Sequence, residues 1–124
     1  MAMEVFCEFT VEASHCLPRV PPGHPCGPLH GHSYRIAIHV VGPIDEELGW
    51  VTDYATVQEA FEPLRRQLDN RTLNEVEGLE NPTSEILARW IWTRLLPTLP
   101  GLSRVVVQET TTTGSVYTGE GEER

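Results

Sequence analysis

The stretch HSYRIAIHVV, residues 32–41, sets the fold class of this chain. Every second residue is apolar over its length, which predicts a β-strand with one buried face. The face carries Tyr34, Ile36, Ile38 and Val40. Gly42-Pro43 follows and ends the pattern, because neither residue continues a strand well.

A second strand pattern precedes it at residues 4–15, with Val5, Cys7, Phe9 and Val11 on one face. Between the two strands, residues 17–31 contain five prolines and three glycines. Such a composition stops regular structure and predicts a long loop. Long loops inside compact domains are usually functional, so this loop is a candidate site.

Helical spacing follows over residues 54–69, through Val57, Ala60, Phe61, Leu64 and Leu68. Pro63 falls inside that pattern and is expected to kink or divide the helix. Asn81-Pro82 is expected to start a second helix, with Asn81 as N-cap and Pro82 at the first helical position. Its apolar stripe comprises Ile86, Leu87, Trp90, Ile91 and Leu95.

Two closing strands are predicted at residues 103–109 and 114–118, and residues 119–124 are expected to fray. The predicted order is therefore ββααββ, in one α+β domain spanning residues 1–124. The formal net charge of −9 argues against a nucleic-acid partner, because it repels a phosphate backbone. No apolar run approaches the roughly 20 residues of a membrane helix, and residues 1–5 lack the features of a signal peptide. We therefore expect a cytoplasmic protein with no membrane partner.

The histidines carry the strongest chemical signal. His30 and His32 are two residues apart in a strand pattern, so both side chains can aim at one point. His15 ends the preceding strand and can join them if the two strands pair. Three imidazoles with an open fourth position are typical of a catalytic zinc site. Spacing alone leaves two alternatives, a chance His-x-His pair and a closed structural site with Cys26 as fourth ligand. His24 and His39 have weaker claims, and Cys7 and Cys16 are interpreted as packing residues.

Several motifs resemble the 6-pyruvoyl-tetrahydropterin synthase family. The hallmark of this family is similar to the segment Cys26-Gly27-Pro28-Leu29-His30-Gly31-His32-Ser33-Tyr34. The first-strand motif of the family is similar to the segment Phe9–His15. The further matches, in chain order, are Gly49–Tyr54, Leu68-Asp69, Leu73-Asn74, Gly78–Glu85 and Gln108-Glu109-Thr110. The similarity covers residues 4–119.

The resemblance implies a tunnelling fold, an antiparallel four-stranded sheet with two helices on one face. It implies zinc on His15, His30 and His32, with Cys26 as the catalytic base. It also implies that Glu109 anchors the pterin and takes part in proton transfer. Thr83 and Ser84 match positions that approach the pterin from a neighbouring subunit, although helix capping explains them equally well.

The implied substrate is 7,8-dihydroneopterin triphosphate. Among family members the chain is most similar to bacterial enzymes that form 6-carboxy-5,6,7,8-tetrahydropterin, acetaldehyde and triphosphate in queuosine and 7-deazapurine biosynthesis. The family assembles as a homohexamer, a dimer of trimers, with active sites between subunits. Two alternatives are 6-pyruvoyl-tetrahydropterin formation, by triphosphate elimination alone, and a pterin- or metal-binding homologue that has lost catalysis.

One position departs from the family pattern. Members usually carry Asp-His where this chain has Asp69-Asn70, and that histidine completes a proton relay with the cysteine. Asparagine cannot accept or store a proton at neutral pH, so no acid–base role transfers to Asn70. Asp69 remains as a candidate catalytic residue without its usual partner. Slower catalysis, altered product choice and loss of activity are the three possible consequences.

Overall fold

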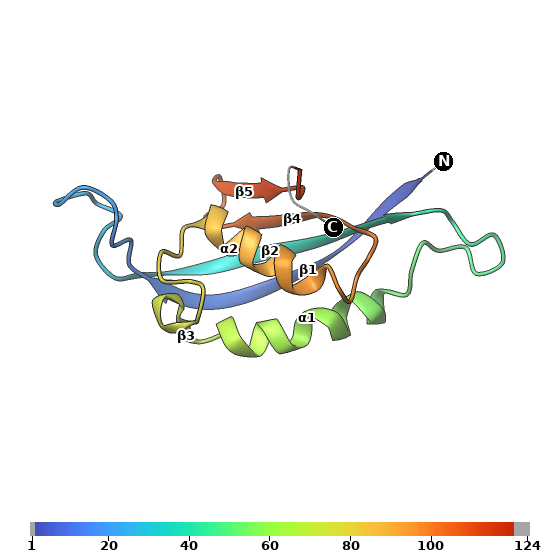
Figure 1. The fold of residues 1–124 in the computed structure, drawn as a ribbon, viewed down its shortest axis with the longest axis horizontal. Coiled ribbons are helices and arrows are strands. Elements are labelled where there is room, and N and C mark those ends of the chain that lie inside the picture. The colour runs from blue at the N-terminus through green and yellow to red at the C-terminus, as the bar shows by residue number, and fades with distance from the viewer. Residues whose placement is uncertain (1, 121–124) are drawn as a thin grey trace.

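The computed structural model describes residues 2–120, which form one five-stranded sheet with two helices packed on one face (Figure 1). The strands are β1 (Met3–His15), β2 (His30–Gly42), β3 (Arg71–Thr72), β4 (Leu102–Gln108) and β5 (Gly114–Tyr117). The helices are α1 (Tyr54–Leu68), the 3-10 turn η1 (Leu73–Glu75) and α2 (Ser84–Leu95). The predicted α+β class is confirmed.

The long β1–β2 hairpin forms the centre of the sheet. Its antiparallel register runs without interruption from Met3 opposite Gly42 to His15 opposite His30. The predicted apolar faces of both strands are the buried ones, and they contribute Val11, Ile36 and Ile38 to the core beneath α1 and α2. The buried face of the hairpin is therefore continuous up to the end where the histidines lie.

The sheet has one more strand than expected, in the order β3-β1-β2-β4-β5. The extra strand, β3, is two residues long and pairs parallel to Ala13 and Ser14 of β1, whereas every other pair is antiparallel. Two residues cannot display a period-two pattern, so this strand could not be predicted from periodicity.

The helices differ from expectation in two details. Pro63 does not divide α1, which is continuous from Tyr54 to Leu68. Pro63 is exposed, so the carbonyl that loses its usual N–H donor there can face water. The second helix is capped by Thr83 and not by Asn81, since the Thr83 hydroxyl accepts the Ile86 N–H at 3.1 Å. Pro82 therefore lies outside α2, with its carbonyl free for another donor.

The closing strands agree with prediction to within one residue at each end. Of the range expected to fray, Gly119 is buried and has a left-handed φ of 70°, and a side chain there would collide with the Trp92 ring. Residues 121–124 lie outside the described part of the chain. Between residues 2 and 120, neither helix has the length and apolarity to cross a membrane.

Candidate metal centre

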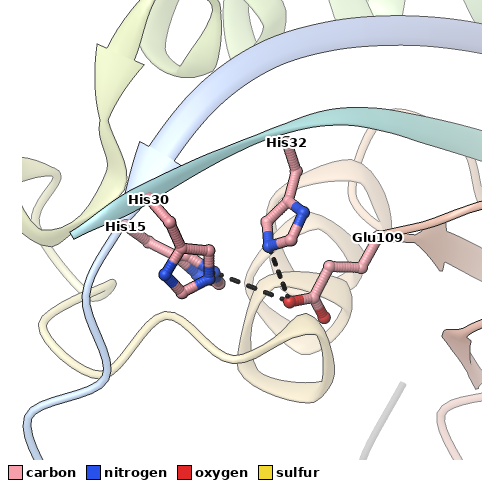
Figure 2. A group of neighbouring side chains, drawn as sticks. All are labelled: His15, His30, His32 and Glu109. Carbon is pink, nitrogen blue, oxygen red and sulfur yellow. Dashed lines mark hydrogen bonds and ion pairs between the residues drawn. The ribbon is translucent and has the colours of Figure 1, made fainter. Parts of the chain in front are cut away.

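Three histidines and one glutamate converge at one end of the sheet (Figure 2). His15 is the last residue of β1, and His30 and His32 are at the start of β2. The register places His30 opposite His15 and His32 opposite Ala13, so the three imidazoles project from the core face of the hairpin. Glu109 is the residue directly after β4, and its side chain points toward the three imidazoles.

The four potential ligand atoms lie within 4.8 Å of one another. The Nε2 atoms of His15 and His30 are 3.0 Å apart. One carboxylate oxygen of Glu109, Oε1, lies 3.1 Å from His32 Nε2 and 3.5 Å from His15 Nε2. For comparison, four atoms held tetrahedrally at about 2.0–2.1 Å from a zinc ion are about 3.3 Å apart.

Backbone carbonyls fix which ring nitrogens carry protons. His15 Nδ1 is 2.7 Å from the carbonyl oxygen of Pro82, and His30 Nδ1 is 2.7 Å from that of Pro28. A carbonyl can only accept, so both Nδ1 atoms are the donors. Neutral imidazoles then carry lone pairs on Nε2, and those of His15 and His30 face each other. This is how metal-binding histidines are usually held by their surroundings.

The Nε2 lone pairs of His15 and His30 would be stabilised by a cation between them. His32 Nε2 is buried and makes no hydrogen bond within residues 2–120, although a Glu109 oxygen lies next to it. Burial is the main cause that lowers the pKa of His15, which favours its neutral, ligating form. The Nε2 lone pairs of His15 and His30 and the Glu109 carboxylate oxygen repel one another unless a metal ion lies among them. The residues present therefore fit a metal.

Sequence reasoning missed two supporting groups, the Pro82 carbonyl and the Tyr34 hydroxyl. Tyr34 is fully buried, its hydroxyl lies 3.1 Å from His15 Nδ1, and its ring packs edge-on against those of His15 and His32. Burial, assisted by the negative charge of Glu109, raises the pKa of Tyr34 well above its ordinary value, so the phenol stays protonated. The available signal was position: Tyr34 follows His32 by two residues and shares its face of the strand.

Cys26 lies apart from the four ligand atoms, on the exposed loop between β1 and β2. The loop is closed at its base by the Leu17 N–H, which donates to the Gly27 carbonyl at 3.2 Å. The Cys26 N–H donates to Nδ1 of His24 at 3.0 Å. In the described chain the fourth group beside the histidines is thus Glu109, and Cys26 does not close the site.

Cys7 and Cys16 belong to the packing of the fold. Cys7 is buried, and burial raises the pKa of its thiol. The backbone N–H and carbonyl of Cys16 are both bonded by the Asn74 side-chain amide, at 2.9 Å each. Asn74 thereby fixes the chain immediately after His15.

Asp69 is not among the potential ligands that gather with the three histidines, and Asn70 lines a cavity together with one of them, His32. The Asp69 carboxylate accepts the Glu12 N–H at 2.9 Å and an Arg65 N–H at 3.3 Å, so it ties α1 to β1. Asn70 has a left-handed φ of 60°, a conformation that asparagine tolerates, and donates its N–H to the Glu12 carbonyl. It borders an open, polar cavity of about 500 Å³ that Arg71 also lines.

Thr83 and Ser84 have structural roles in this chain. Thr83 caps α2, and the buried Ser84 hydroxyl lies 2.6 Å from the Ser115 hydroxyl of β5. The capping interpretation of Thr83 is confirmed, while a contact of either residue with a pterin remains a prediction.

Comparison with known proteins shows the class to which this fold and site belong. Residues 4–120 match the family model described as 6-pyruvoyl tetrahydropterin synthase, and the chain belongs to this family.

Among curated relatives, it is 38% identical to 6-carboxy-5,6,7,8-tetrahydropterin synthase of Synechocystis, over 91% of each chain. It is 32% identical to 6-pyruvoyl tetrahydrobiopterin synthase of Dictyostelium discoideum, over 77% of this chain and 74% of that one. The solved structure of 6-pyruvoyl tetrahydropterin synthase from Caenorhabditis elegans has the same fold, with a TM-score of 0.88 at 22% identity and 96% coverage of both chains.

Proposed function

We propose that this protein is a zinc-dependent lyase that converts 7,8-dihydroneopterin triphosphate to 6-carboxy-5,6,7,8-tetrahydropterin, acetaldehyde and triphosphate, in queuosine and 7-deazapurine biosynthesis. The observation that carries the proposal is the convergence of His15, His30, His32 and Glu109 on one point. The similarity to the Synechocystis enzyme over nearly the whole chain supports the choice of product.

His15, His30 and His32 hold the metal in this proposal. Their Nε2 atoms supply three nitrogen ligands, and the Pro82 and Pro28 carbonyls orient His15 and His30 through Nδ1. A bound zinc ion supplies Lewis-acid chemistry, which makes a proton on the carbon beside a coordinated oxygen easier to remove.

Cys26 takes that proton as its thiolate. Its exposure on the loop between the metal-bearing strands supports this role, because a substrate that reaches the histidines also reaches the loop. Glu109 holds the pterin by a two-pronged pairing of its carboxylate with the ring's amino group and adjacent N–H. A Cys26→Ala variant should therefore still bind zinc and substrate but form no product.

Asp69 and Asn70 enter the site from a neighbouring subunit in this proposal. The short edge strand β5, whose Val116 is 58% exposed, supports a homohexamer with shared active sites. Sedimentation equilibrium tests the assembly, and a monomer at micromolar concentration would contradict it.

Asn70 gives a second test. Histidine tolerates the left-handed backbone conformation of this position, and it restores an acid–base group where asparagine has none. We expect Asn70→His to raise kcat, and steady-state product assays measure it. An equal or lower kcat in a correctly folded variant would show that the chain does not depend on a relay at this position.

Product analysis decides the reaction. Zinc-loaded protein is incubated with dihydroneopterin triphosphate, and pterins and acetaldehyde are quantified, with Cys26→Ala as control. Acetaldehyde in equal amount to a carboxylated pterin supports the proposal. A pyruvoyl pterin without acetaldehyde would identify triphosphate elimination alone. No product above the control would favour a binding protein, the interpretation that Asn70 supports.

A further inference from the structure

The position of Glu109 suits a metal ligand as well as a residue that anchors the substrate. Its Oε1 atom is 3.1 Å from His32 Nε2 and 3.5 Å from His15 Nε2, and it belongs to the compact group of four ligand atoms. Figure 2 shows the carboxylate turned toward the imidazoles. The cluster thus has four protein donors, the number that fills a tetrahedral site.

Hydrogen bonding does not account for this position. The Nδ1 proton of His15 is committed to the Pro82 carbonyl, so its Nε2 has only a lone pair to offer the carboxylate. His32 Nε2 forms no hydrogen bond within residues 2–120. A negatively charged oxygen 3.5 Å from the lone pair of His15 Nε2 is unfavourable unless a cation separates them.

The Glu109 side chain is also free to leave. Its backbone is held by its N–H, which donates to the Thr113 carbonyl at 3.0 Å. Within residues 2–120 the only basic atoms within 4 Å of its carboxylate are Nε2 of His15 and Nε2 of His32, and 24% of the side chain is exposed. Rotation about the side-chain bonds can therefore move the carboxylate toward solvent without disturbing β4.

We propose that Glu109 is the fourth metal ligand of the substrate-free centre, and that the pterin ring opens the metal by taking this carboxylate away. The inference rests on the proposed function for the anchoring role of Glu109. A two-pronged pairing with the aminopyrimidinone edge needs both carboxylate oxygens, so Oε1 cannot stay on the metal. The fourth position becomes available only when the correct ring is bound.

The test uses Co²⁺-loaded protein and azide, a small anion that reports an available coordination position through its charge-transfer absorption. Wild type is compared with Glu109→Gln and with a control, Glu8→Gln, which alters an exposed carboxylate of β1. We expect Glu109→Gln to bind azide at least tenfold more tightly than wild type and the control. Equal azide affinity in wild type and Glu109→Gln would overturn the proposal, since the fourth position would already be open.

A second titration tests the exchange. Isocytosine carries the aminopyrimidinone edge but has neither the side chain nor the chelating ring nitrogen of a pterin. It should strengthen azide binding in wild type several-fold and leave Glu109→Gln unchanged. No effect of isocytosine on wild type would overturn the exchange. A chain that binds no Co²⁺ would overturn this inference and the zinc proposal together. Neither titration involves turnover. Both can therefore still be interpreted if the product assay shows no activity.

Discussion

The two ends of the same hairpin each hold histidine next to glutamate, with opposite consequences. At the far end from the metal centre, Glu4 accepts from the Ser103 hydroxyl at 2.6 Å and from Arg104 Nε and His39 Nδ1 at 3.2 Å each. At the near end, Glu109 faces nitrogen lone pairs and receives no donor among the described residues.

The difference lies in the supply of protons and not in residue type. In the Glu4 cluster the carboxylate accepts hydrogen bonds from its neighbours. These bonds, of which that from Ser103 has the largest effect, lower the pKa of Glu4. In the Glu109 cluster, His15 and His30 donate their Nδ1 protons to backbone carbonyls, which leaves their Nε2 atoms as acceptors facing the centre. A histidine–glutamate pair therefore indicates a metal site when its donors point elsewhere, and a structural ion pair when they point inward.

The largest expected effect separates the two clusters directly. His30→Ala removes one of three nitrogen ligands and should weaken zinc binding by on the order of a thousandfold, with loss of activity. His39→Ala should leave zinc stoichiometry and affinity unchanged, because it removes only a contact with Glu4 and a stack on Phe6. Metal analysis after dialysis against a chelator measures both. Zinc lost equally from the two variants would contradict the distinction.

A smaller effect is expected from Tyr34→Phe, which keeps the ring and removes only the hydroxyl beside His15. Loss of such a supporting group typically costs about 10–100-fold in metal affinity. We expect faster zinc release to a chelator in stopped-flow measurements. Tyr117→Phe, at a partly buried tyrosine packed against Trp92, is the matched control. If both variants release zinc like wild type, the hydroxyl has no part in holding His15.

The smallest effect concerns Glu4 and depends on pH. The folded-state pKa of Glu4 lies below the ordinary value of a glutamate, 4.5, so its ionised form stabilises the fold above that value. The contribution is lost as pH falls through the lowered folded-state pKa. Glu4→Gln should thus reduce the free energy of unfolding by about 1 kcal/mol at pH 7 and by less near pH 3. Urea denaturation at both pH values measures this, and a pH-independent difference would argue against an ionised Glu4.

Most of the scaffold was predictable because the hairpin and both helices bury apolar faces with clear periods. The histidine triad was suggested by spacing, and family resemblance supplied its interpretation. Local signals offered both Asn81 and Thr83 as the cap of the second helix, and the Thr83 hydroxyl that accepts the Ile86 N–H distinguishes them. The spacing of Tyr34 from His32 indicates a shared face, but the contacts of the Tyr34 hydroxyl and of Glu109 with His15 join different strands, and no local pattern encodes them.

The uninterrupted register of the β1–β2 hairpin has a consequence for how this protein can change. Inserting or deleting one residue within either strand would turn the following side chains to the opposite face, and the core and the histidines would be lost together. Residues 17–29 carry no such constraint on length, since they join the strands outside the ladder. Length variation is therefore tolerated beside Cys26 and forbidden beside the metal, so new substrate preferences can arise in the loop while the metal centre is inherited intact.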